Sequence, residues 1–177
     1  MIRLRPIAAG PAMPQPDLPA WFDADRAAFM QSGVSMSLGA RDARLRPSVT
    51  RGVGCRVLPG GEVRLFVNGP QAGTLLDDIA TTGQVAVVFS DIVSHRTLQL
   101  KAIDARVQAL DVDDHAAVDA YAHAFAAIIV GYGYPATIPQ AILHAPAADR
   151  VAIVCRPHEG FEQTPGPQAG QRLEGGR

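Results

Sequence analysis

The fold of this chain is decided by residues 35–107, which read SMSLGARDARLRPSVTRGVGCRVLPGGEVRLFVNGPQAGTLLDDIATTGQVAVVFSDIVSHRTLQLKAIDARV. Apolar and polar residues alternate over several short segments, which is the period of a half-buried β-strand. The order strand, strand, strand, helix, strand, strand favours a small β-barrel, because a dinucleotide-binding α/β sheet alternates strands and helices regularly. The expected strands are Ser35–Arg41, Arg46–Leu58, Val63–Asn68, Val85–Ser90 and Arg96–Val107, and the expected helix is Thr74–Thr82.

Turn and cap residues separate these segments. Pro59-Gly60-Gly61 is a strong turn signal between two strands. Thr74 stands where an N-cap belongs, and Asp77 follows three residues later, where a capping-box acid belongs. Gly83 is expected to end that helix.

Helical and strand patterns also flank this central stretch. An apolar stripe at helical spacing precedes Gly33, a second helix is expected over Asp113–Val130, and a last strand over Val151–Cys155. We therefore expect an extended arm over residues 1–16, a single domain over 17–163 and a flexible tail over 164–177, which is rich in Gly, Pro and Gln.

Composition excludes several classes of protein. The 177 residues suit one domain, and a formal net charge of -1 gives no basic face for nucleic acid. No apolar run approaches the roughly 20 residues of a membrane span, and the first residues lack the apolar core of a signal peptide. Cys55 and Cys155 lie in apolar runs without metal-ligand spacing, so a soluble cytoplasmic protein with two buried thiols is expected.

Basic residues gather in and after one predicted hairpin. A phosphate dianion needs several donors, and arginine offers a planar fork for its oxygens. The hairpin could therefore present an anion site, although basic side chains also protect edge strands from aggregation. The residues in question are Arg41, Arg44, Arg46, Arg51 and Arg56, followed later by Arg96 and Lys101.

Two other patterns carry weaker signals. The loop after Asn68 leads into a helix start, where backbone N–H groups bind anions, but it lacks the lysine of a P-loop. Acidic and histidine residues recur every four positions at Asp111, His115, Asp119 and His123, which is better explained by a solvated helix face than by a metal site. No G-x-S-x-G nucleophile motif is present, which disfavours hydrolase chemistry.

The order of these parts resembles the pyridoxamine 5'-phosphate oxidase-like proteins, the flavin-binding split β-barrels. The resemblance covers residues 32–110 and rests on ARDARLRPSVTRGVGCRV, VRLFVN, GTLLDDIATTGQVAVVFSD and HRTLQLKAIDARV. It implies a mainly β fold with flanking helices, a six-stranded split β-barrel of the FMN-binding type. It also implies a homodimer with one flavin mononucleotide (FMN) in each of two grooves between the subunits.

The resemblance further implies a set of cofactor-binding residues. The second strand would approach the flavin, the third would lie beside its ring or ribityl chain, and the fifth would hold phosphate or ribityl oxygens. These residues are Arg46, Ser48, Thr50, Arg51, Val67, Asn68, Thr74, Arg96, Thr97 and Gln99. The oxidase itself carries Ser-Arg-Lys after its third strand, where this chain has Gly69–Thr74 without a cation, so pyridoxamine phosphate oxidation is not expected.

Three functions remain open at this point. The first is an FMN-dependent oxidoreductase with a small-molecule substrate that the sequence does not specify, and with no named catalytic residue. The second is a binding module for flavin or haem, with His95 or His158 as candidate axial ligands. The third is a cofactor-free dimer. Apart from the iron of haem in the second, none of them involves a metal site, and none involves a membrane or nucleic acid.

Overall fold

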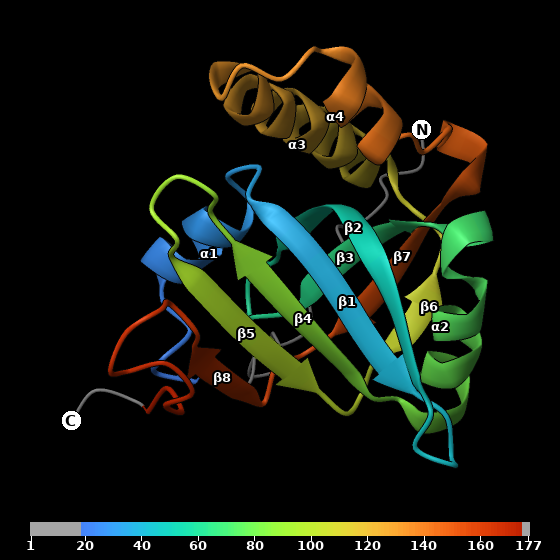
Figure 1. The fold of residues 1–177 in the computed structure, drawn as a ribbon. Coiled ribbons are helices and arrows are strands. Elements are labelled where there is room, and N and C mark those ends of the chain that lie inside the picture. The colour runs from blue at the N-terminus through green and yellow to red at the C-terminus, as the bar shows by residue number, and fades with distance from the viewer. Residues whose placement is uncertain (1–18, 175–177) are drawn as a thin grey trace, which may run out of the picture.

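The computed structural model describes residues 19–174 and contains one antiparallel sheet with helices around it (Figure 1). The strands follow one another across the sheet in the order β6-β7-β3-β2-β1-β4-β5-β8. They are β1 (Ser35–Arg41), β2 (Pro47–Val57), β3 (Val63–Asn68), β4 (Val85–Ser90), β5 (Thr97–Ala102), β6 (Arg106–Gln108), β7 (Arg150–Cys155) and β8 (Glu159–Glu162). The helices are α1 (Ala24–Met30), α2 (Gly69–Thr82), α3 (Val112–Gly131) and α4 (Thr137–Ile142), with a 3₁₀ turn over Ala147–Asp149.

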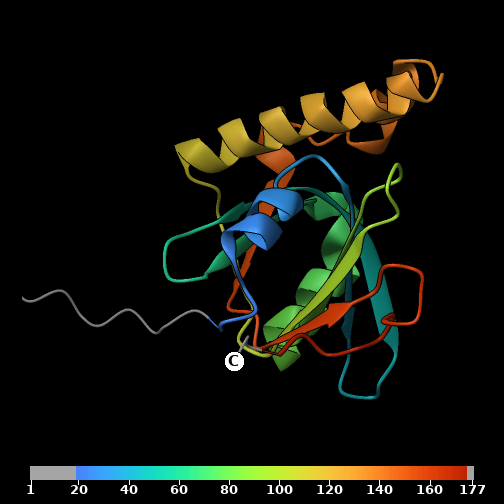
Figure 2. The same ribbon diagram turned by 90° about the vertical axis from the view of Figure 1, so that its left-hand side faces the viewer.

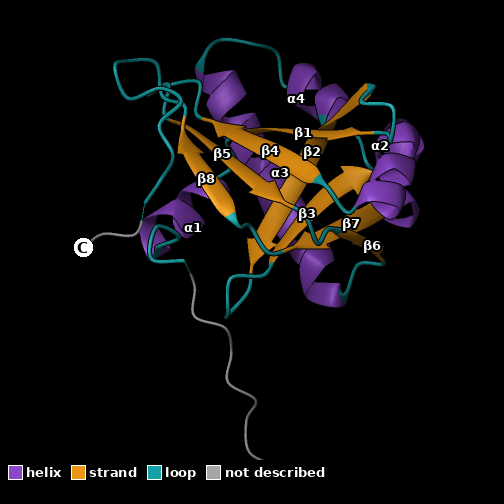
Figure 3. Ribbon diagram, turned by 90° about the horizontal axis from the view of Figure 1, so that it is seen from below, coloured by secondary structure: helices purple, strands orange, loops and turns teal. Residues whose placement is uncertain are grey.

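The sheet curls strongly, as its connections require. Residues 103–105 join β5 to β6 and residues 156–158 join β7 to β8, although each link connects strands near opposite edges of the sheet. So few residues span at most about 14 Å, whereas six strand spacings in a flat sheet amount to about 29 Å. Figure 3 accordingly shows the β4–β5–β8 part crossing the β3–β7 part. Within residues 19–174 the edge strands β6 and β8 do not pair, so the barrel stays split.

Two apolar clusters fill the molecule. The larger one lies inside the curled sheet and includes Phe29 and Met30 of α1 and Leu75 and Ile79 of α2. The smaller one lies between α3, α4 and the outer side of β2, β3 and β7. Every residue of β3 is buried, because helices and core cover it on both sides. The outer side of β1, β4 and β5 has no such helical cover within the described residues, and it faces the viewer in Figure 1.

A buried charge cluster fixes the start of α3. The Asp114 side chain is fully buried and accepts hydrogen bonds from Arg64 Nε at 2.9 and 3.0 Å and from Arg56 Nη1 at 2.7 Å. Asp111 and Asp114 also form a capping box at the helix N-terminus. Burial alone would raise the pKa of Asp114, but the bonds from Arg64, Asp111 and Arg56 hold it below its usual value.

The predicted fold class is confirmed, but three predictions about its elements were wrong. Helix α2 begins at Gly69 with Asn68 as its N-cap, so Thr74 lies inside the helix rather than at its start. The single strand expected over Arg96–Val107 is two strands, β5 and β6, in different parts of the sheet. Strand β8 was not predicted at all. The sheet therefore has eight strands in place of the six expected from the resemblance.

The chain after β8 folds back along that strand. Leu173 N donates to Gly160 O at 2.8 Å, and Gly170 N donates to Glu162 O at 2.7 Å. Part of the C-terminal tail that was predicted to be flexible therefore covers the outer edge of β8. The arm predicted over residues 1–16 lies outside the described residues. None of the helices within residues 19–174 combines the length and the apolar character needed to cross a bilayer.

Candidate functional site

The uncovered outer side of β1, β4, β5 and β8, which we call the open face, carries small residues at its centre. Strand alternation puts every second residue on this face, and the register aligns them in rows across the strands. One row joins Arg51, Ser37, Val88, Gln99 and Phe161, and the next joins Gly39, Ala86, Lys101 and Glu159. The centre of the face therefore carries the short side chains of Ser37, Ala86 and Val88 beside Gly39 and is nearly flat, with Arg51 and the exposed Val49 on one side and Gln99 and Lys101 on the other.

Three of the predicted cofactor residues meet on the open face. The Arg51 guanidinium donates to Ser35 Oγ at 3.3 Å and lies 5.9 Å from the centroid of the Phe125 ring, at the border with α3. Gln99 accepts a hydrogen bond from the side-chain amide of Gln163 at 3.2 Å. Thr97 lies two residues from Gln99, and its hydroxyl is 2.8 Å from that of Ser90 in the neighbouring strand β4. A guanidinium, an amide and hydroxyl groups thus surround the flat centre.

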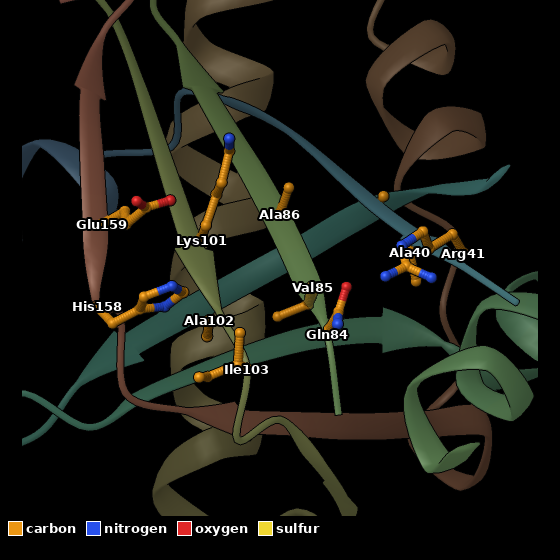
Figure 4. Close-up of a pocket in the computed structure, with 11 residues that line it drawn as sticks. Ala40, Arg41, Gln84, Val85, Ala86, Lys101, Ala102, Ile103, His158 and Glu159 are labelled. Atoms are coloured by element: carbon orange, nitrogen blue, oxygen red, sulfur yellow. The ribbon is translucent and has the colours of Figure 1, made fainter. Parts of the chain in front are cut away.

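A pocket of about 420 Å³ lies at the end of the open face near the β1–β2 hairpin (Figure 4). Arg41 and Lys101 stand on opposite sides of it, and His158 lies at its margin. Glu159, the acidic residue of the lining, is bound by Arg172 at 3.2 Å. The local charge is therefore positive.

Residues of the second strand divide between two sides of the sheet. Ser48 and Thr50 alternate with Arg51 and lie on the inner side, where the Ser48 hydroxyl donates to the Asp78 carboxylate at 2.5 Å. Arg46 lies at the hairpin end and binds Asp42 at 2.7 Å, with a side chain that is 74% exposed. Hydrogen bonds from the Arg46 backbone and side chain keep the pKa of Asp42 below its usual value. These three residues thus stabilise the hairpin and its packing on α2 and do not reach the open face.

The residues predicted from the third strand and the following helix are also occupied elsewhere. The Val67 side chain is fully buried in the core. Asn68 caps α2 and donates from its amide nitrogen to His144 O at 2.9 Å. Thr74 is exposed on α2, away from the open face.

Arg96 precedes β5 and turns toward α1. It pairs with Asp25, and its guanidinium lies 4.4 Å from the centroid of the Phe29 ring. The hydrogen bond from Arg96 holds the pKa of Asp25 below its usual value. His95 is exposed in the β4–β5 turn with a φ of 61°. Neither side chain belongs to the group around Arg51.

The two thiols lie inside the protein. Burial raises the pKa of Cys155 to about 12 and raises that of Cys55 further. Cys55 donates to Met30 O at 3.2 Å. Neither thiol has the exposure or the thiolate character of a nucleophile. Within residues 19–174 no cluster of three or more metal-ligating side chains occurs.

Sequence reasoning missed part of the pocket. Arg41 and Lys101 belonged to the basic cluster, but Gln84 and Glu159 were not singled out, and His158 was considered only as a haem ligand. Strand alternation would have grouped Lys101 with Gln99. The contribution of residues 158–159 could not be foreseen, since β8 itself was not predicted.

Comparisons with known proteins find solved structures whose folds are similar to that of this chain. No family model and no curated protein matches the chain. HupZ of Group A Streptococcus is 15% identical, with a TM-score of 0.52 over 84% of this chain and all of that one (100%). A putative pyridoxamine 5'-phosphate oxidase from Lactobacillus delbrueckii is 16% identical, with a TM-score of 0.49 over 79% of this chain and 93% of that one. HutZ, described as the haem storage protein of Vibrio cholerae, is 14% identical, with a TM-score of 0.46 over 78% of this chain and 92% of that one.

At these identities the likeness to HupZ concerns the fold alone. The chain has a split β-barrel, since β6 and β8 do not pair within residues 19–174, and it shares its overall fold with HupZ.

Proposed function

We propose that this chain binds FMN against the open face and that a second copy of the chain closes over the cofactor. The observation that carries the proposal is the grouping of Arg51, Thr97 and Gln99 around a flat centre. A planar ring needs a surface without long side chains, and Ser37 and Val88, which lie between Arg51 and Gln99, would provide it. Mostly apolar or small surroundings with a few placed polar groups are typical of cofactor sites.

The polar groups fit the parts of the cofactor. Arg51 is a suitable phosphate ligand, since within residues 19–174 it forms no ion pair with a carboxylate. Thr97 and Gln99 offer hydroxyl and amide groups for ribityl oxygens or ring heteroatoms. Bound FMN would supply the redox chemistry, and the protein would position it and set its electrostatic surroundings. The activity we propose is therefore that of an oxidoreductase.

The second copy is proposed because one face of a sheet covers only one side of a planar ring. A symmetric partner would shield the other side and exclude water from both cofactors. The buried thiols of Cys55 and Cys155 suit a reducing compartment, so we place the protein in the cytoplasm.

Haem is the second candidate ligand. It is favoured by the position of His158, which lies at the margin of the open face and could ligate iron there. A flavin spectrum and a Soret band are readily distinguished, so one absorbance measurement separates the two candidates.

The experiment compares two arginines from neighbouring parts of the fold. Removing Arg51 should raise the dissociation constant of FMN by about 10- to 100-fold, the cost of one charge-assisted hydrogen bond of about 1.5–3 kcal/mol. Arg96→Ala is the matched control, because Arg96 is already paired with Asp25 beside α1. FMN affinity is followed by quenching of flavin fluorescence. Equal affinity in wild type and Arg51→Ala would contradict the proposed phosphate position.

A further inference from the structure

The pocket at the hairpin end of the open face has a character of its own. It is lined by β1, β4, β5 and the residues that lead into β8, and its volume of about 420 Å³ lies in the range of small-ligand sites. Figure 4 shows Ala86 and Val85 between Arg41 on one side and Lys101 on the other. The pocket thus has an apolar floor between two cations.

Within the described residues the two cations of the pocket lack acidic partners, as Arg51 does. Most arginines on the surface are bound to carboxylates, as Arg46 is to Asp42. Arg41, by contrast, donates only to the backbone oxygen of Asp42 at 3.3 Å, and the Lys101 ammonium lies 4.5 Å from the Phe161 ring centroid. Within residues 19–174 neither forms an ion pair.

The acid in the pocket is already neutralised. Glu159 is the residue directly opposite Lys101 in the β5–β8 register, yet its carboxylate pairs with Arg172 at 3.2 Å instead. An incoming anion would therefore meet two available cations and an acid whose charge is balanced. His158, next along the chain, adds an imidazole that can donate a further hydrogen bond.

The apolar part of the lining indicates what else the ligand carries. Ile103 lies at the pocket and is 64% exposed as a residue, and Ala86 and Val85 form the floor. A bare inorganic anion would leave this surface in water. An organic anion with an apolar body would bury it while its acidic group reaches the cations.

We infer that this pocket binds a small organic anion, whose carboxylate or phosphate is attracted by the positive charges of Arg41 and Lys101 and whose apolar body contacts Ile103 and Ala86. The row of Gly39, Ala86 and Lys101 is two residues from the row of Ser37 and Gln99, a distance of about 7 Å along the strands. If FMN lies over the row of Ser37 and Gln99, as the proposed function requires, the ligand of this pocket is the substrate.

The test uses the purified full chain without added flavin, with benzoate and phenyl phosphate as probes and neutral benzamide as control. Binding is measured by calorimetry and by chemical-shift changes of His158. One or both anions should bind, benzamide at least ten-fold more weakly, and Arg41→Gln and Lys101→Gln should each weaken anion binding at least ten-fold. Arg106→Gln is the matched control, because Arg106 is an exposed arginine paired with Glu62 away from the pocket.

The outcomes separate this inference from the proposed function. Anion binding that is lost in Arg41→Gln but not in Arg106→Gln supports the pocket, whether or not FMN binds. Unchanged anion binding in both pocket variants, or equal binding of benzamide, overturns it. FMN affinity is titrated in the same variants, and a loss in Arg51→Ala with retention in Arg41→Gln assigns the two ligands to separate places. Displacement of the anions by inorganic phosphate and FMN alike would identify the pocket as the flavin phosphate site and overturn the substrate role.

Discussion

Replacing Asp114 by asparagine tests how α3 is held on the sheet. The carboxylate is fully buried and accepts bonds from Arg64, from Arg56 and from the Asp111 backbone N–H at 3.0 Å. Asparagine keeps the size and one acceptor oxygen but removes the charge. Two guanidinium groups then share a neutral partner at the base of the helix.

The loss of stability in Asp114→Asn depends on how deeply its two arginine partners are buried. The Arg64 side chain is only 9% exposed, so water compensates little for the loss of its counter-ion. The Arg56 side chain is 20% exposed and keeps Asp111 and Asp113 as partners. Removing one partner of a buried ion pair costs about 3–5 kcal/mol of the free energy of unfolding. Because Arg56 keeps other carboxylate partners, we expect a loss at the lower end of this range, about 3 kcal/mol. With an m-value of about 2 kcal/mol per M, the urea midpoint should fall by about 1.5 M.

Urea unfolding followed by circular dichroism measures this change. Asp113→Asn is the matched control, since Asp113 is 73% exposed and lies 3.3 Å from the Arg56 guanidinium. That variant should change the free energy of unfolding by less than about 0.5 kcal/mol. A stability of Asp114→Asn within 0.5 kcal/mol of the wild type, about the error of the method, would refute the role given to the buried cluster.

Three further outcomes are expected. The pKa of Asp114 is lowered in the folded state, so its contribution to stability is present above the unfolded-state pKa of about 3.9 and is lost as the pH falls through the folded-state pKa. Acid unfolding, monitored by fluorescence, should therefore be less steep in Asp114→Asn. In thermal melts, Gly33→Ala should destabilise the protein by about 2–4 kcal/mol, because Gly33 has a φ of +84° and a Cβ there would lie 2.8 Å from the backbone N of Phe125. Gly73→Ala is the control and should stabilise the protein slightly, because a Cβ there would meet open space on α2. Cys55 and Cys155 should resist iodoacetamide in the native protein and react after unfolding, with mass spectrometry as the readout; rapid native labelling would contradict their burial.

The strands could be predicted where alternation and turn residues agree. The boundaries of β1, β3 and β4 follow from Ser35–Arg41, Val63–Asn68 and Val85–Ser90, because local pattern and final environment coincide there. The predicted start of α2 was wrong because the residues after Asn68 were interpreted as a loop, whereas the proline at position 70 also suits the first turn of a helix.

The errors elsewhere depend on distant contacts. The residues after β5 continue an alternating pattern, but the Ala105 N–H donates to Gly83 O at 2.9 Å and Asp104 accepts from the Arg156 N–H, which ends the strand. Arg96 pairs with Asp25, 71 residues earlier in the chain, and no local pattern reveals that choice. Strand alternation predicts which residues of β1, β4 and β5 lie on the open face, but not the part from β8 or the extent of the face, which depends on where α3 stops covering β2 (Figure 2).

The proposed function requires that FMN binds to the open face between two copies of the chain. The direct measurement is the absorbance of the purified protein after addition of FMN and gel filtration, together with its mass by light scattering. We predict bands at about 370 and 450 nm that co-elute with a dimer at one flavin per chain. A colourless monomer that leaves all the FMN in the late-eluting fractions would contradict the account.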